Sequence, residues 1–205
     1  MSLRSAEKDL EKFLDKCVYK ILYKRDITIR EKDKSASLKV VKINVDSNFL
    51  EPVIEFITSP KTTMKIMQSK KQCDGNMVVE TDEGKVFCIL CELKTTLYDD
   101  EILYDTRKKN KSTAKGQIKS TLVYLWMILR FLELEPKFSA IVFYMKDKRS
   151  KTLPPTDIDP YLQKETDIDG GCWDLDLPND RKLTVKYKLV HANNDQTFYL
   201  SSILP

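Results

Sequence analysis

Histidine and glycine are scarce in this sequence. The chain holds one histidine among 205 residues, so a zinc hydrolase or a Ser-His-Asp enzyme would have too few imidazoles to build its site. It holds five glycines, and neither a G-x-x-x-x-G-K-[ST] loop nor a G-x-G-x-x-G fingerprint is present. The sequence therefore argues against zinc hydrolysis, a serine triad and nucleotide binding by a glycine-rich loop.

Long hydrophobic runs and a paired set of cysteines are also missing. No apolar run approaches the roughly 20 residues of a membrane span, and the first residues carry charges where a signal peptide would be apolar. The five cysteines are scattered, which suits reduced thiols better than structural disulfides. We therefore expect an intracellular protein, cytoplasmic or associated with the nucleus or nucleoid, that is neither secreted nor membrane-bound.

Length and composition fit one folded domain over residues 1–205. Hydrophobic residues make up 41% of the chain and charged residues 32%, which is a globular composition on the charged side. The net charge is only +4, but its distribution is uneven, and residues 157–180 are strongly acidic. A single-sign field over one segment affects the choice of partner more than the total charge does. The basic residues of the 107–119 segment are Arg107, Lys108, Lys109, Lys111, Lys115 and Lys119.

The pattern of apolar residues predicts an α/β fold. Residues 154–181 are expected to form loops. The strands predicted at 27–30 and 38–45 are expected to form one hairpin, and those at 183–190 and 197–203 a closing hairpin. Helices are predicted at 5–24, 48–58 and 114–134. Strands are predicted at 27–30, 38–45, 62–68, 77–81, 86–95, 138–144, 183–190 and 197–203.

The stretch CILCELKTT, residues 88–96, carries the most informative charges. Because strand side chains repeat with period two, Glu92 and Lys94 share one face of the predicted strand. Burying either charge would cost several kcal/mol unless it is paired or bound to a metal. A turn centred on Glu83 and Gly84 would place Asp74 beside Leu93 on the neighbouring strand. Two carboxylates and a backbone carbonyl, with an amine beside them, form a set of groups that suits Mg²⁺ and an activated water.

These residues resemble the signature of the PD-(D/E)XK nuclease superfamily, also called restriction-endonuclease-like. Asp74 opens one strand, Glu92-Leu93-Lys94 closes the next, and Gln117 lies near the start of the following helix. The resemblance implies a core of helix, three strands, helix and strand over about residues 48–146, with a mixed central sheet flanked by helices. An N-terminal helix and hairpin, and a C-terminal extension over 147–205, would be additions to that core.

The resemblance also implies a role for each residue. Asp74, Glu92 and the backbone carbonyl of Leu93 would bind Mg²⁺ or Mn²⁺, Lys94 would position the attacking water, and Gln117 would organise the site. Gln117 is similar to the glutamine of the recombination-exonuclease and lambda-exonuclease branches. A further metal ligand is expected from the first core helix, where Glu51 and Glu55 are the candidates. The expected function is hydrolysis of phosphodiester bonds in DNA, with the basic residues between 107 and 119 holding phosphates.

The sequence departs from the superfamily pattern at two positions and leaves three other interpretations open. Cys73 stands where the namesake proline would be, and Thr121 stands where the exonuclease branches often have an aromatic residue. The same fold could serve as a catalytically silent module that binds nucleic acid or acts as a scaffold. The chain could also be an unrelated α/β interaction protein that docks through 157–180, or Glu92 and Lys94 could be an ordinary surface pair. RNA as substrate and a homodimer are left open.

Overall fold

The structure, a computed structural model, describes residues 2–14, 16, 18–31, 33–57, 72–98, 113–149, 170–177 and 181–205. Within these residues the strands form a seven-stranded mixed sheet and a three-stranded sheet, so the fold is α/β as predicted. The elements are α1 (Leu3–Phe13), β1 (Tyr19–Leu22), β2 (Asp26–Arg30), β3 (Val40–Asn44), β4 (Phe49–Phe56), β5 (Gly75–Thr81), β6 (Val86–Leu97), α3 (Ala114–Phe131), β7 (Lys137–Asp147), β8 (Gly170–Leu177), β9 (Arg181–His191), β10 (Gln196–Tyr199) and α4 (Leu200–Ile203).

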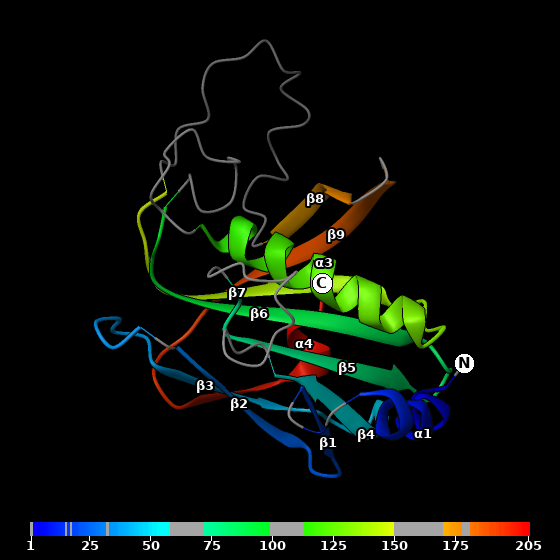
Figure 1. Ribbon diagram of the computed structural model, residues 1–205. Coiled ribbons are helices and arrows are strands. Elements are labelled where there is room, and N and C mark those ends of the chain that lie inside the picture. The colour runs from blue at the N-terminus through cyan, green and yellow to red at the C-terminus, as the bar shows by residue number, and fades with distance from the viewer. Residues whose placement is uncertain are drawn as a thin grey trace.

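The large sheet runs in the order β1-β4-β5-β6-β7-β9-β8, and the small sheet in the order β10-β3-β2. Helices α1 and α3 lie across the front of the large sheet in Figure 1 and share a hydrophobic core with it. The small sheet and α4 form a second core with the large sheet. Leu90 belongs to the first core and Ile89 to the second, as the alternation of a strand requires. Glu92 and Lys94 therefore share the α3 face with Leu90.

Strands β5 and β6 form the predicted hairpin, closed by a tight turn. Gly84 adopts a positive φ of 74°, which glycine tolerates at little cost, and its N–H donates to the Thr81 carbonyl over 2.9 Å. The pairing differs from the prediction by one residue, because Gly75 pairs with Cys91 rather than with Glu92. The printed pairing ends at this pair, and Asp74, directly before Gly75, contacts β6 through its side chain, which accepts a hydrogen bond from the Leu93 N–H. The turn was thus predicted correctly, and the register was not.

The predicted helix at 48–58 is wrong, because this segment forms strand β4. Glu51 and Glu55 are four residues apart, a spacing that places side chains on one face of a strand as well as of a helix. Val53, Ile54 and Phe56 are all buried, as a strand between two others requires. The pairing with β5 shifts between Leu50 and Ile54. Beyond the shift, the Asn76 side chain satisfies both Phe56 N–H (3.0 Å) and Phe56 C=O (2.9 Å).

The predicted helix at 5–24 is correct only in its first half. Ser2 caps α1 by accepting a hydrogen bond from the Ser5 N–H, and the chain turns to an extended conformation at Leu14. Strand β1 follows and pairs with β4. Apolar residues at 18, 19, 21 and 22 fit either period, and pairing with the sheet edge favours the strand.

The C-terminal segment also differs from the prediction. The strand expected at 183–190 is β9, but it pairs with β7 and β8 rather than with the end of the chain. Strand β10 instead runs parallel to β3 in the small sheet, and Leu200–Ile203 forms a short helix. The first hairpin, β2 and β3, is confirmed, as are α3 and β7. The strand predicted at 62–68 lies outside the described residues, as does most of the loop region predicted at 154–181. The described part of that region, Gly170–Leu177, is strand β8 rather than a loop, because it pairs with β9.

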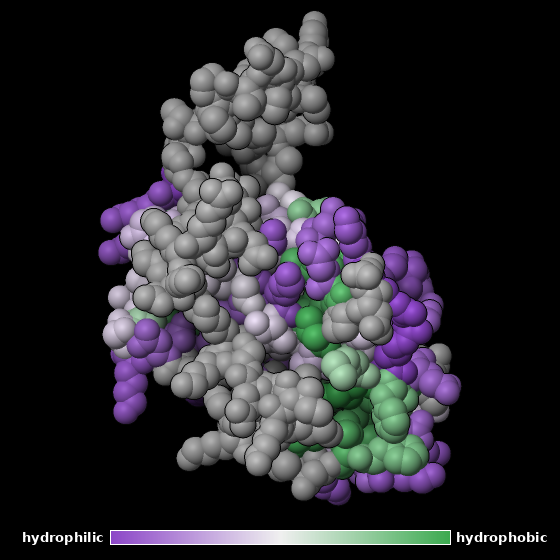
Figure 2. Space-filling model, turned by 45° about the horizontal axis from the view of Figure 1, so that its top comes forward, coloured by the Kyte–Doolittle hydropathy of each residue, from purple (hydrophilic) through white to green (hydrophobic). Residues whose placement is uncertain are grey.

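Hydrophobic side chains remain exposed where α1 and α3 end. Phe13 and Phe131 meet edge to face with ring centroids 5.7 Å apart, and both are more than half exposed. Figure 2 shows hydrophobic residues gathered on this side of the molecule.

Among the described residues, no helix combines the length and the hydrophobicity needed to cross a membrane.

Candidate active site

Asp74 lies directly before β5, at the end of the β5–β6 hairpin opposite to its turn. Its Oδ2 accepts a hydrogen bond from the Leu93 N–H over 2.8 Å, which fixes the carboxylate at the edge of β6. Within a strand the N–H and C=O of one residue point to the same side. The Leu93 carbonyl therefore faces the edge at which Asp74 lies, as the predicted ligand set requires.

Glu92 is a carboxylate enclosed by the protein. Its side chain is 1% exposed, and Oε1 lies 2.8 Å from Lys94 Nζ. The Lys94 ammonium is in ion-pair contact with this oxygen, and no other described group donates a hydrogen bond to either Glu92 oxygen. Burial raises the pKa of Glu92 well above its usual value; Lys94 opposes this rise, while Asp74 and Glu31 add to it.

Lys94 and Gln117 connect β6 to α3. The Lys94 ammonium donates to Gln117 Oε1 over 2.7 Å, and Gln117 Nε2 donates to the Gln72 carbonyl over 3.2 Å. The helix is held in register because Thr113 caps it by accepting from the Gly116 N–H over 3.1 Å. The structure thus brings Asp74, Glu92, Lys94 and Gln117 together, although they are spread over more than forty residues of sequence.

A surface cleft of ≈ 400 Å³ reaches Asp74 from the side of β1 and β2. Of the two glutamates predicted as further ligands, Glu55 lines this cleft, where Lys20 lies 3.5 Å away. Glu51 does not line it and forms an ion pair with Arg25 at 3.8 Å. Because β4 is a strand, neither glutamate comes from a core helix. The lining residues are Lys20, Leu22, Lys24, Asp26, Ile27, Thr28, Arg30, Glu31, Glu55 and Asp74.

Glu31 belongs to the site region, although no pattern in the sequence indicates it. It directly follows β2, lines the cleft beside Asp74, and adds to the rise in the pKa of Glu92. The cause is tertiary, since Ile29 packs directly on Gly75: a Cβ at Gly75 would collide with Ile29 Cδ1. This contact brings the end of β2 to the start of β5. A packing contact between segments more than forty residues apart leaves no local signal in the sequence.

The basic segment is described only in part. Lys115 and Lys119 lie in the first turns of α3 and are half-buried. Lys119 and Gln117 share the N-terminal part of the helix that reaches Lys94. The other predicted phosphate-binding residues, Arg107, Lys108, Lys109 and Lys111, lie outside the described residues.

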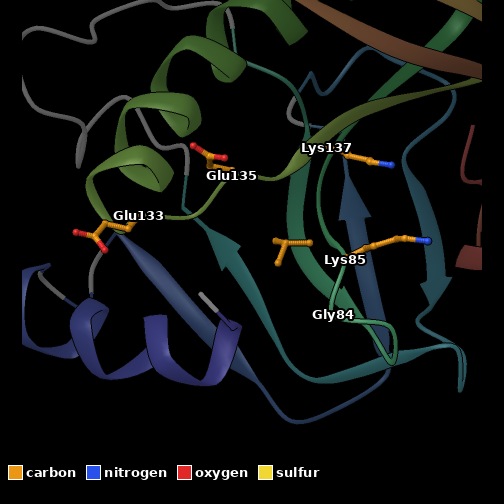
Figure 3. A pocket seen from close by; sticks show the side chains of 6 residues that line it. Gly84, Lys85, Glu133, Glu135 and Lys137 are labelled. Carbon is orange, nitrogen blue, oxygen red and sulfur yellow. The ribbon is translucent and has the colours of Figure 1, made fainter.

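A second pocket, of ≈ 320 Å³, lies at the turn end of the β5–β6 hairpin. Glu133 and Glu135 lie on one side of it and Lys85 and Lys137 on the other, as Figure 3 shows. All four side chains are exposed. Exposed charges of both signs are already solvated, so this pocket has none of the electrostatic demand for a ligand that Glu92 creates.

The donor set of the site is compatible with a divalent cation. The carboxylate of Asp74 lies at the backbone of Leu93 and interacts electrostatically with that of Glu92, and hard oxygen donors of this kind suit Mg²⁺ and Mn²⁺. Among the described residues, no group of three or more His, Cys, Asp or Glu side chains is close enough to hold a metal alone. Because Mg²⁺ usually keeps several waters and binds through one or two carboxylates, two side chains suffice for it.

Comparisons of the chain with models of protein families, with curated proteins and with solved structures found no match. The chemistry of the site is therefore inferred from the arrangement of its residues.

Proposed function

We propose that the protein is a nuclease that uses Mg²⁺ or Mn²⁺ to hydrolyse phosphodiester bonds of DNA. One observation carries the proposal: the Glu92 side chain is buried beside Asp74, and the only charge of opposite sign that the described residues place against it is the Lys94 ammonium, 2.8 Å from Oε1. Burying a carboxylate in this way costs several kcal/mol, even with one partner. Such a cost is expected where the group serves a ligand rather than the fold.

The charges of the site favour a bound cation. Among the described residues, the carboxylates of Asp74 and Glu92 lie close enough to repel each other, since the charge of Asp74 adds to the rise in the pKa of Glu92. A divalent cation would offset this repulsion and bind both carboxylates. When bound, Mg²⁺ or Mn²⁺ would polarise the scissile phosphate and neutralise the charge that develops on it.

Lys94 is the group that would act on the attacking water. Its ammonium is only 15% exposed and is held between Glu92 Oε1 and Gln117 Oε1. A cationic donor fixed in this way can hold a water by a hydrogen bond and orient it toward a phosphate bound at Asp74. Gln117 would act through Lys94, by setting the direction of the ammonium.

The order of elements supports an assignment to the PD-(D/E)XK superfamily. Strands β4, β5 and β6 form an antiparallel meander, α3 follows, and β7 returns parallel to β6. This is the three-strand, helix and strand order expected from the resemblance, with Asp74 directly before the second strand and Glu92 on the third. The preceding helix would be α1 rather than a helix at 48–58, with β1, β2 and β3 inserted between it and the core.

Cationic residues along the cleft support DNA as the substrate. Lys20, Lys24 and Arg30 line the cleft that ends at Asp74, and Lys115 and Lys119 lie near the start of α3. Phosphate contacts of this kind position a nucleic acid without reading its sequence. RNA presents the same phosphates and would be tested alongside DNA.

A second candidate keeps the fold and the binding surface without catalysis. It is favoured by the absence, within the described ranges, of a third carboxylate close enough to complete a metal site with Asp74 and Glu92. Such a module would bind nucleic acid equally well in EDTA and in Mg²⁺, and it would leave the nucleic acid intact.

Cleavage of DNA by the purified protein with Mg²⁺ or Mn²⁺ tests the proposal. Lys94→Ala should lower the rate by about 10²- to 10⁴-fold, which is the usual contribution of a positioned proton-transfer group. Lys137→Ala, at an exposed lysine of the second pocket, is the matched control and should cleave at the wild-type rate. Cleavage that survives Lys94→Ala would refute the mechanism, and binding in EDTA without cleavage under any metal would favour the silent module.

A further inference from the structure

Thr121 is a buried hydroxyl residue one helical turn after Gln117 on α3. Its side chain is 1% exposed. Its Oγ1 donates to the Gln117 carbonyl over 3.1 Å, a bond within the helix that fixes the rotamer of the threonine. The same oxygen accepts a hydrogen bond from the Cys73 N–H over 2.9 Å. The hydroxyl therefore links α3 to the residue directly before Asp74.

Gln117 and Thr121 together hold the segment that leads into β5. Gln117 Nε2 donates to the carbonyl of Gln72, and Thr121 accepts from the amide of Cys73, so two consecutive residues are bound by one face of the helix. Gln117 also binds Lys94 of β6. One turn of α3 thus fixes both the amine on β6 and the backbone that carries the carboxylate before β5.

We propose that Thr121 is a positioning residue: its hydroxyl holds the Cys73 amide and thereby places the Asp74 carboxylate for metal binding and for the reaction. This inference rests on the proposed function. Removing the hydroxyl would break the hydrogen bond that ties the buried Cys73 N–H to α3, and the backbone before Asp74 would shift. Residues behind a metal ligand that orient it usually affect affinity or activity about 10- to 100-fold when they are changed.

Three variants separate the hydroxyl from the bulk of the side chain. Thr121→Val keeps the volume and loses the hydroxyl, whereas Thr121→Ser keeps the hydroxyl. Ser120→Ala is the matched control, because Ser120 Oγ makes the same kind of bond within α3, to the Gly116 carbonyl over 3.0 Å. Urea unfolding first establishes that each variant is folded, and Thr121→Ala replaces the valine variant if that variant does not fold.

Two measurements read out the positioning, one of them independent of cleavage. Calorimetric titration with Mn²⁺ should show that Thr121→Val binds the metal about 10- to 100-fold more weakly, while Thr121→Ser stays close to the wild type. In DNA cleavage, Thr121→Val should lower kcat and leave KM unchanged, and Thr121→Ser should restore kcat. Exchange of the Cys73 amide in the metal-free protein should be faster in Thr121→Val than in Ser120→Ala.

The outcomes distinguish this inference from the function on which it rests. If Thr121→Val binds Mn²⁺ and cleaves DNA like the wild type, the positioning role is refuted, while wild-type cleavage that depends on Lys94 leaves the proposed function standing. Equal losses in Thr121→Val and Thr121→Ser would refute it too, since the serine keeps the hydroxyl. If the wild type neither binds Mn²⁺ nor cleaves DNA, the proposed function fails and the positioning role fails with it.

Discussion

Replacing Glu92 by glutamine should stabilise the metal-free protein while removing its response to metal. The glutamine has nearly the same shape and carries no charge, so it avoids the cost of ionising a side chain that is 1% exposed. Its amide can also accept from Lys94 through Oε1. The wild-type carboxylate is thus expected to lower the stability of the fold in the absence of metal, a trade-off that is common at functional sites.

The magnitude follows from the linkage between protons and folding. Burial raises the pKa of Glu92 in the folded state well above its usual value near 4.5, against the opposing effect of Lys94. Between these two pKa values the folded state binds one proton more than the unfolded state does. The free energy of unfolding of the wild type therefore falls as pH rises, by about 1.4 kcal/mol for each pH unit in that window. Glu92→Gln lacks this slope, so its advantage over the wild type grows at the same rate.

Urea unfolding in EDTA at pH 5.5, 6.5 and 7.5, followed by tryptophan fluorescence, measures the difference. The matched control is Glu83→Gln, at an exposed glutamate in the β5–β6 turn whose pKa is lowered by Lys85. It is ionised in both states over this range, so its stability profile should run parallel to that of the wild type. A stability difference between Glu92→Gln and the wild type that stays constant with pH would refute the reasoning.

Saturating Mg²⁺ should stabilise the wild type and leave the free energy of unfolding of Glu92→Gln nearly unchanged. A ligand that binds only the folded state at a concentration 100 times its Kd stabilises that state by about 2.7 kcal/mol. The wild type should gain on this order in saturating Mg²⁺, and Glu92→Gln should gain little. Equal gains in both proteins would show that Mg²⁺ binds somewhere other than at Glu92.

Two further predictions concern the contact between the sheets. Gly75→Ala should destabilise the fold by about 1 to 3 kcal/mol, because the new Cβ would collide with Ile29 Cδ1. Urea unfolding of the double variant with Ile29→Val should recover part of the lost free energy of unfolding. If the losses of the two single variants simply add in the double variant, the contact is contradicted. Glu31→Gln should lower the pKa of Glu92, since the Glu31 charge raises it. The fall in the free energy of unfolding with rising pH should then end at a lower pH in this variant than in the wild type. If it ends at the same pH, the two carboxylates do not interact.

The sequence predicted those elements whose signals are local. The β5–β6 turn rests on a glycine with positive φ, and α3 on a run of apolar residues after a threonine cap. The segment at 48–58 failed because a spacing of four residues fits both a helix and a strand, and only the strands on either side of β4 decide between them. The pairing predicted for the last strand failed for a similar reason, since the partner of β10 is β3, about 150 residues earlier in the chain.

The register of the hairpin is the feature of the site that the sequence predicted least well. Residues that lie opposite each other on paired strands project to the same face of the sheet. In the predicted register Asp74 would lie opposite Leu93, whose side chain belongs to the core shared with the small sheet, and the two carboxylates would point to opposite faces. In the observed register the last pair is Gly75 with Cys91, and Asp74, directly before it, reaches β6 through its side chain, which accepts from the Leu93 N–H. A spacing pattern alone does not encode register to the residue, so the motif predicted which residues meet but not how the two strands pair.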